Sequence, residues 1–264
     1  MSEAAPAPAA QLLTLPPFFS LVVKDIVDST NDEVVLRAES GALEGLLVWA
    51  HRQRKGRGRS GRSWESPAGN LYCSVLLRPI AQPSIAAQLV FVAGIAVREC
   101  VAQLVKNGRK VLCKWPNDIL IDGEKVAGIL LEAVAEEGET TRVIVGIGIN
   151  IADHPCETVH PATDLLAHAE KSVSPADVLE LLAPTLEGWY HAWQTEGFEP
   201  IREAWLEHAA GLGETVAARL PDYELRGKII SLDEHGALEL RTPDEETHLV
   251  TVGEVFFSRA RIGG

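Results

Sequence analysis

The chain has 264 residues, 46% of them apolar, which is enough for one large hydrophobic core and a smaller module. Its 37 acidic residues outnumber 24 basic ones, and this net charge of −13 argues against general binding to nucleic acid or to an anionic membrane surface. The most apolar run, at 89–97, is much shorter than the roughly 20 residues of a membrane span, so we expect no membrane association.

The first 150 residues predict a mixed sheet with helices. Residues 1–17 have neither the basic start nor the apolar run of a signal peptide, and we expect a disordered tail there. A helix is predicted at 28–41 and a strongly apolar one, buried against the sheet, at 85–108. Strands are predicted from alternating or β-branched segments at 18–27, 46–50, 70–78, 111–115, 119–121, 125–134 and 141–151.

The helix at 28–41 begins with a capping signature. Thr30 and Glu33 fit the S/T-x-x-E pattern, and Gly41 supplies the stop. Ser29, Thr30 and Asn31 therefore lie where a strand becomes a helix. Their polar groups are placed either to cap the helix or to point into a site.

The sequence pattern changes in the last third of the chain. Residues 174–194 predict an amphipathic helix, with Pro175 at its first position and an interruption at Pro184, and 200–209 predicts another. Beyond them come short alternating segments separated by turn residues, typical of a small β-barrel. We therefore expect two domains, at 18–211 and 212–264.

Residues 51–64, HRQRKGRGRSGRSW, hold five arginines, one lysine and no acid. Glycines free the backbone of this loop, so its N–H groups and guanidinium groups could wrap around an anion. The loop is not a P-loop, and a flexible, solvated loop is the alternative interpretation. Trp64 at its end could support a purine ring or belong to the core.

Two further segments carry candidate chemistry. Lys114 ends a buried strand, where an ammonium group needs an anion unless it reaches the sheet edge, and both interpretations stay open. Asp118 could simply cap the turn that follows. Glycines inside strands, at Gly128 and in GIGIN at 146–150, indicate close approach of a ligand or another backbone, or plain close packing.

The four cysteines show no CxxC spacing and no pairing with histidines. We therefore expect reduced thiols in a cytoplasmic protein.

Taken in order, DSTN at 28–31, Gln53 followed by GRGRSGRSW, NLYCSVLLRP, KWPNDIL, KVAGILLE and GIGIN resemble the biotin protein ligase family over about residues 20 to 152. The resemblance implies an α+β fold: a mixed β-sheet packed against helices, as in class II aminoacyl-tRNA synthetases and biotin ligases, with a C-terminal SH3-like β-barrel. Lipoate ligases share the fold but lack the combination of GRGR with KWPND. Ligation of lipoate or octanoate is the closer alternative, and a nucleic-acid-binding module using the basic loop is another.

The family resemblance implies a ligase with a two-step reaction. Biotin's carboxylate attacks the α-phosphate of Mg-ATP to form biotinyl-5′-AMP, and a lysine of a biotin carboxyl carrier domain, part of a biotin-dependent carboxylase, then displaces AMP. Two anions must meet, so the basic loop would gather the cations that an acidic chain otherwise lacks. No nucleic acid is expected as a partner, and an exposed sheet edge leaves a homodimer open.

The matching motif positions imply site residues. Lys114, Arg57 and Arg59 would be catalytic, and Mg²⁺ would be held by the phosphates of ATP, with no protein ligand identified. The implied biotin-binding residues are Ser29, Thr30, Asn31, Gln53, Gly56, Arg57, Gly58, Arg59, Lys114 and Gly128. The implied ATP-binding residues are Arg57, Arg59, Arg62, Trp64, Lys114 and Asn150.

Three departures from the family pattern stand out. Arg54 and Lys55 make the loop more cationic than is common in the family, and Ser60 replaces a residue that is often basic. An N-terminal DNA-binding domain, present in the regulatory members, is not expected here, so the chain should not act as a repressor.

Overall fold

The computed structural model describes residues 13–135, 141–156, 158 and 160–257. Its main sheet has seven strands in the order β1-β2-β3-β7-β6-β5-β4, in which β1 and β2 pair parallel and every other pair is antiparallel. The strands are β1 (Ser20–Val27), β2 (Leu46–Gln53), β3 (Leu71–Leu77), β4 (Val111–Lys114), β5 (Asp118–Ile121), β6 (Glu124–Ala135) and β7 (Thr141–Ile149).

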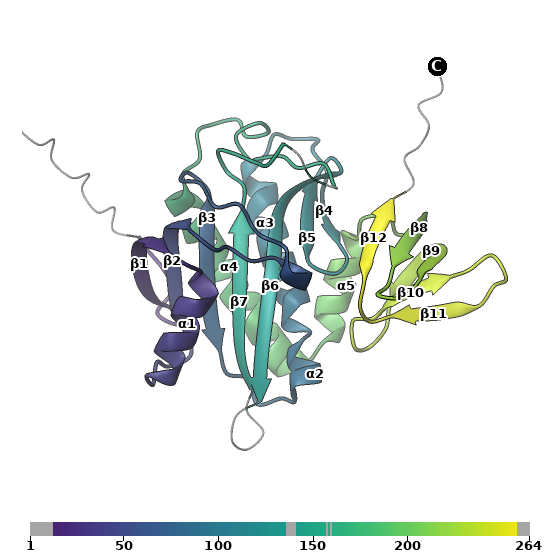
Figure 1. Cartoon of the computed structure of the whole chain (residues 1–264), viewed down its shortest axis with the longest axis horizontal. Coiled ribbons are helices and arrows are strands. Elements are labelled where there is room, and N and C mark those ends of the chain that lie inside the picture. The colour runs from purple at the N-terminus through teal and green to yellow at the C-terminus, as the bar shows by residue number, and fades with distance from the viewer. Residues whose placement is uncertain (1–12, 136–140, 157, 159, 258–264) are drawn as a thin grey trace, which may run out of the picture.

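Helices cover both faces of this sheet unequally. α3 and α4 pack behind it, whereas α1 and the basic loop with its short 3₁₀ helix η1 lie in front (Figure 1). The expected mixed sheet packed against helices is confirmed. The helices are α1 (Thr30–Glu39), η1 (Arg59–Gly61), α2 (Pro83–Ala86), α3 (Leu89–Leu104), α4 (Pro175–Glu196) and α5 (Glu199–Glu207).

Alternation along the central strands separates the core from the front face. In β7, Val145 and Ile147 belong to the hydrophobic core with the rear helices, while Gly146 and Gly148 face forward. In β6, Gly128 lies opposite Gly148 in the strand register and also faces forward. The glycines thus leave a hollow on the front of the sheet.

The predicted capping box of α1 is wrong. Ser29 occupies the N-cap position without a capping side-chain hydrogen bond, and Thr30 is the first helical residue. The Thr30 hydroxyl instead hydrogen-bonds Gln53 of β2. A hydroxyl at a strand-to-helix junction can either cap the helix or hydrogen-bond a residue distant in sequence. Here the Thr30 hydroxyl bonds Gln53.

The predicted interruption of the long C-terminal helix at Pro184 is also wrong, because α4 runs unbroken through it. Proline removes one backbone hydrogen bond from a helix. Leu182 and Leu186 on either side of Pro184 are buried in the core. Their burial favours a helix that continues through the proline.

One segment, Pro83–Leu104, is long and apolar enough to cross a membrane by length and composition. It comprises α2 and α3, and 67% of its most apolar window is buried inside the protein. α3 packs against α4, β4 and β6. Its hydropathy is accounted for by its place in the core.

The C-terminal strands form an antiparallel sheet in the order β11-β10-β9-β8-β12. Trp115 Nε1 donates to the Gly236 carbonyl at 3.1 Å and Arg202 Nε to the Leu232 carbonyl at 2.8 Å, which ties this sheet to the end of β4 and to α5. The strands are β8 (Thr215–Arg219), β9 (Glu224–Leu232), β10 (Leu238–Arg241), β11 (Thr247–Val250) and β12 (Glu254–Phe257).

At the N-terminal side, residues 1–12 of the predicted tail lie outside the described residues. Leu13 and Leu15, at the end of that predicted tail, pack against the core. The four cysteines are free, as expected for thiols, and burial raises the pKa of the Cys73, Cys100 and Cys113 thiols to about 12.

Candidate active site

A cavity of about 480 Å³ lies in front of the sheet, between α1, the basic loop, the strands β4 to β7 and the start of β12. Every residue that the family resemblance implies lines this cavity except Gly56. Those residues are Ser29, Thr30, Asn31, Gln53, Arg57, Gly58, Arg59, Arg62, Trp64, Lys114, Gly128 and Asn150.

Gly56 is buried at the base of the basic loop. A Cβ atom there would lie 2.6 Å from Ser66 Oγ and 3.0 Å from Gln53 Nε2, so a larger residue would displace them. Its carbonyl accepts a hydrogen bond from Trp64 N at 2.8 Å. Gly56 therefore shapes the loop from behind.

One end of the cavity is built from neutral polar side chains that hydrogen-bond to one another. Gln53 Oε1 accepts from Thr30 N at 2.8 Å and from Thr30 Oγ1 at 3.1 Å. Ser74 Oγ lies 2.7 Å from Thr30 Oγ1 and 2.6 Å from Asn31 Oδ1, and its single proton is donated to one of these oxygens at a time. Ser29, Thr30 and Asn31 are all buried. Buried polar groups with mutual partners form a wall that is in place before a ligand arrives.

The strand glycines make room for side chains of the protein itself. A Cβ at Gly148 would lie 2.6 Å from the Trp64 indole, and one at Gly128 would lie 2.9 Å from it. A Cβ at Gly146 would collide with Asn31. Close approach was one of the sequence interpretations, and the groups that approach are Trp64 and Asn31.

Trp64 thus lies on a glycine floor inside the cavity. Lys125 Nζ lies 5.2 Å from its ring centroid, and Trp64 Nε1 is buried without a hydrogen-bond partner among the described residues. A buried indole N–H normally has an acceptor.

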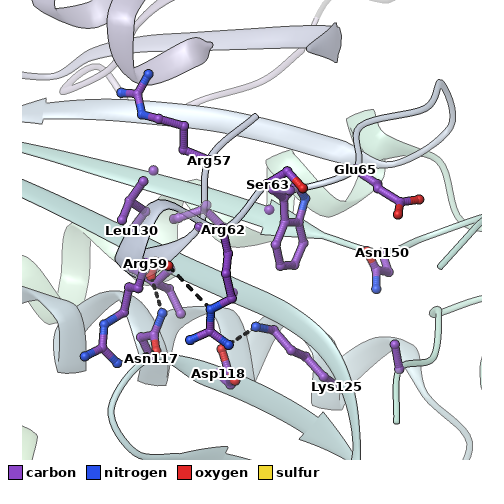
Figure 2. A pocket seen from close by; sticks show the side chains of 18 of the residues that line it. Arg57, Arg59, Arg62, Ser63, Glu65, Asn117, Asp118, Lys125, Leu130 and Asn150 are labelled. Carbon is purple, nitrogen blue, oxygen red and sulfur yellow. Dashed lines mark hydrogen bonds and ion pairs between the residues drawn. The ribbon is translucent and has the colours of Figure 1, made fainter. Parts of the chain in front are cut away.

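Most cations of the basic loop are paired with carboxylates. Arg57 forms a two-pronged pair with Asp32, in which both distances are 2.8 Å, and contacts Glu132 at 3.2 Å. The hydrogen bond to Asp32 is the main cause that raises the pKa of Arg57. Arg62 Nη1 lies 2.8 Å from Glu254 Oε1 of β12. Figure 2 shows Arg57 pointing away from Arg59 and Arg62.

The additional cations that distinguish this loop are also neutralised. Lys55 Nζ lies 2.8 Å from Asp28 Oδ2, and Arg54 lies 3.8 Å from the same carboxylate. The hydrogen bond from Lys55 is the main cause that lowers the pKa of Asp28. These two cations therefore tie the loop to the strand-to-helix junction before α1.

Arg59 differs from its neighbours. Its Nη1 donates to Asn117 Oδ1 at 3.2 Å, and it forms no ion pair with a described carboxylate. Burial lowers the pKa of Arg59. A guanidinium that has left water without a counter-anion favours an anionic ligand.

Lys114 is the most deeply buried cation of the site, with 3% of its surface exposed. Its Nζ lies 3.2 Å from His160 Nε2 and faces the Phe257 ring at 5.8 Å. Burial lowers the pKa of Lys114 to about 8, and the charges of Asp118 and Glu254 oppose that shift. The interpretation of Lys114 as a lysine that reaches solvent at the sheet edge is wrong.

A resident metal site is not evident in the part of the chain that the structure describes, where no three His, Cys, Asp or Glu side chains group closely enough to hold an ion. Asp118 lines the cavity but lies 2.6 Å from Lys125 Nζ. This donor set fits a metal that enters with the phosphates of a nucleotide, since Mg²⁺ prefers substrate phosphates with one or two carboxylates.

Five side chains that sequence reasoning did not name complete the site. Asn117 belongs to the KWPND segment and could have been found there. His160 and Glu254 line the cavity, and Asp32 and Glu132 pair with Arg57; none of the four carries a local signal, because each lies far in sequence from its partner.

Residues 23–150 match the biotin/lipoate A/B protein ligase family, and residues 211–258 match the biotin protein ligase C-terminal domain. The fold and the cavity thus define a ligase with an added C-terminal module. The chain is 40% identical over 235 residues to a biotin--[acetyl-CoA-carboxylase] ligase of Paracoccus denitrificans, covering 87% of this chain and 97% of that protein. The chain belongs to the biotin protein ligase family, which confirms the resemblance seen in its motifs.

Solved structures agree with this assignment. A biotin protein ligase from Aquifex aeolicus in complex with biotin and ATP superposes with a TM-score of 0.76 at 30% identity, covering 89% of this chain and 97% of that one. A biotin protein ligase from Leishmania major in complex with biotinyl-5-AMP gives 0.62 at 28% identity, covering 90% of this chain and all of that one. The biotin-ligase interpretation is better supported than the alternatives.

Proposed function

We propose that this chain converts biotin and Mg-ATP into biotinyl-5′-AMP and then transfers the biotinyl group to a lysine of a biotin carboxyl carrier domain. The observation that carries the proposal is the division of one cavity into a neutral, hydrogen-bonding end and a cationic end. Biotin likewise has a neutral ureido head and an anionic carboxylate. The neutral end of the cavity therefore suits the ureido head, and the cationic end suits the carboxylate.

The neutral end is assigned to the ureido head. Ser29, Thr30, Asn31 and Gln53 supply short donors and acceptors in a buried setting, where hydrogen bonds to a ligand exclude analogues that lack its polar groups. Gly128 makes room for Trp64 and Lys125 and so shapes the surface that biotin would meet, and Gly56 leaves room for the Gln53 amide.

The cationic end is assigned to the reacting groups. Lys114 would bridge the biotin carboxylate and the α-phosphate, since its buried ammonium group lacks an ion-pair partner among the described residues. Arg57, Gly58 and Arg59 would close over the same anions. Preorganised cations of this kind stabilise the charge that develops as a carboxylate attacks a phosphate.

ATP is assigned to the side that β12 borders. Trp64 would support the adenine ring, Arg62 would bind phosphate, and Asn150 lines the cavity nearby. Mg²⁺ would accompany ATP as part of the substrate, where it neutralises phosphate charge. Asp118 is the carboxylate of the cavity that lies on the strand next to Lys114.

The proposal extends to partners and organisation. The acceptor would be the carrier domain of a biotin-dependent carboxylase in the cytoplasm, and a homodimer stays a prediction. Residues 18–211 would form the catalytic domain and 212–264 the SH3-like barrel. Pairing of the loop cations with Asp28, Asp32, Glu132 and Glu254 leaves little free positive charge, which supports the absence of a nucleic-acid partner.

The test is to incubate the purified chain with Mg-ATP and, separately, biotin, lipoate and octanoate, and to look for each acyl-adenylate by mass spectrometry. We expect the adenylate with biotin alone, and transfer when the carrier domain of an acetyl-CoA carboxylase is added. An adenylate formed with lipoate or octanoate in place of biotin would contradict the proposal.

A further inference from the structure

Glu132 lies on β6 and is not among the residues that line the cavity, yet its carboxylate contacts both ends of the site. Asn31 Nδ2 donates to its Oε2 at 2.7 Å, and Arg57 Nη2 lies 3.2 Å from its Oε1. Asn31 is 3% exposed, and Ser74, the next polar residue behind it, is fully buried. A half-buried carboxylate is therefore joined to a buried network that reaches the cavity.

The carboxylate of Glu132 fixes the orientation of the Asn31 amide. A carboxylate only accepts hydrogen bonds, so the amide turns its NH₂ group to Glu132 and its carbonyl oxygen Oδ1 to Ser74. Oδ1 also only accepts, and Ser74 Oγ lies 2.6 Å from it. The single proton of Ser74 is thus directed to Asn31 and away from Thr30.

Thr30 is the member of this network that lines the cavity. Its Oγ1 lies 2.7 Å from Ser74 Oγ and 3.1 Å from Gln53 Oε1, and its own proton can go to either of them. In both cases Ser74 donates nothing to Oγ1, whose lone pairs stay available to a donor in the cavity. The ureido group of biotin carries N–H donors, whereas the ring of lipoate and the chain of octanoate carry none.

We propose that Glu132 is a positioning residue that, through Asn31 and Ser74, keeps the Thr30 hydroxyl oxygen an acceptor for an N–H group of biotin. The inference rests on the proposed function, which assigns the neutral end to the ureido head. Without an acceptor-only group at position 132 the amide of Asn31 can turn over and donate to Ser74, and Ser74 then donates to Thr30 Oγ1. Part of the acceptor capacity that the ligand needs is then taken.

The test replaces the carboxylate by an amide of the same shape, Glu132→Gln, in the full chain. A glutamine amide can accept or donate, so it no longer fixes the orientation of Asn31. Calorimetry would measure the affinity for biotin and for biotinol, the alcohol that lacks the carboxylate. We expect both affinities to fall about tenfold, which is the effect of one hydrogen bond.

The two ligands separate the two contacts of Glu132. Under the proposed function Arg57 meets the carboxylate of biotin, which biotinol does not have. A loss of affinity for biotin alone would overturn the inference, because Glu132 would then act through Arg57. Asp122→Asn is the control for removal of a carboxylate, since it breaks the pair with Arg109 away from the cavity and should change neither affinity.

Ser74→Ala supplies a readout that a merely structural role would not change. It removes the hydroxyl through which Glu132 acts, so by itself it should weaken biotinol binding less than Glu132→Gln does. Adding Glu132→Gln in this background should have little further effect. A tenfold loss that persists there would overturn the inference, as would wild-type affinity of the single Glu132→Gln variant.

Thermal unfolding would check that Glu132→Gln is folded. Glu132→Ala also frees the Asn31 amide, and it replaces the first variant in every arm if the glutamine chain does not fold. If the wild-type chain binds no biotin, the proposed function fails first and the inference falls with it. If the wild-type chain binds biotin and the Glu132 variants bind biotinol equally well, the inference alone is wrong.

Discussion

The two ends of the cavity differ in how their polar groups are satisfied. At the neutral end, Thr30, Gln53 and Ser74 hydrogen-bond to one another, and each belongs to a helix or strand that the core holds in place. Among the cations, Arg57 and Arg62 are held by carboxylates of the protein, and Glu132 joins Arg57 to Asn31 of the neutral end.

The neutral end is therefore formed before a ligand binds, whereas the cations of the other end need new partners when substrate binds. A network of neutral groups costs little to keep buried, because each hydrogen bond is already made. Buried or half-buried cations need a counter-charge, so in the absence of substrate the protein supplies one or accepts a lowered pKa. We therefore expect substrate anions to replace protein carboxylates at Arg57 and Arg62, and to supply a first counter-charge at Lys114 and Arg59.

The largest expected effect comes from removing the buried cation. Lys114→Met keeps most of the side-chain volume, and we expect adenylate formation, measured by pyrophosphate exchange, to fall about 10²- to 10³-fold. Pyrophosphate exchange at the wild-type rate would show that Lys114 takes no part in adenylate formation.

The same substitution should stabilise the ligand-free protein at pH 7. Because burial lowers the pKa of Lys114 from 10.5 to about 8, the unfolded chain binds the extra proton between these values. Wild-type stability is thus reduced below pH 8 and rises with pH toward 10.5. Thermal unfolding across this range should show a rise in the wild-type protein that Lys114→Met lacks.

The next largest effect is expected from Gly148, which lies beneath the Trp64 indole. Gly148→Ala places a Cβ atom 2.6 Å from the indole and should displace it, raising KM for ATP about tenfold with a smaller change in KM for biotin. Gly188→Ala in α4 is the control, since a Cβ there meets nothing within 4 Å. Equal effects on both KM values would place Trp64 at the boundary between the two substrates.

A smaller effect is expected from the carboxylate that holds Arg57. Asp32→Asn removes the competing anion, and because exposed ion pairs contribute about 0 to 1 kcal/mol, affinity for biotin should rise by a factor of about two to five. Asp122→Asn, which breaks the pair with Arg109 outside the cavity, should leave affinity unchanged. Weaker binding by Asp32→Asn would mean that Asp32 orients Arg57 for the ligand.

The smallest signal is a proton taken up on binding. At pH 8 about half of the Lys114 side chains are charged, and an anionic ligand would charge nearly all of them, so biotin binding should take up about half a proton. Calorimetry in two buffers of different ionisation enthalpy measures this number. The uptake should fall to about a tenth at pH 7, and its absence at pH 8 would show that the carboxylate does not reach Lys114.

Sequence reasoning named many of the residues that line the cavity. Lys114, the GRGR loop and the strand glycines stand in local patterns whose physical meaning can be stated without coordinates, and they converge on one cavity. It failed where two local uses compete, as for Thr30, whose hydroxyl bonds Gln53 instead of capping α1. It also failed at Pro184, where buried neighbours outweigh the lost hydrogen bond.

The sequence by itself determined the order of the strands and helices along the chain and the set of cations, because hydrophobic periodicity and turn chemistry act over a few residues. Only the tertiary structure decided that Glu254 holds Arg62 across 192 positions and that Trp64 fills the space above Gly148. Such contacts depend on how distant segments pack, and no local pattern encodes them.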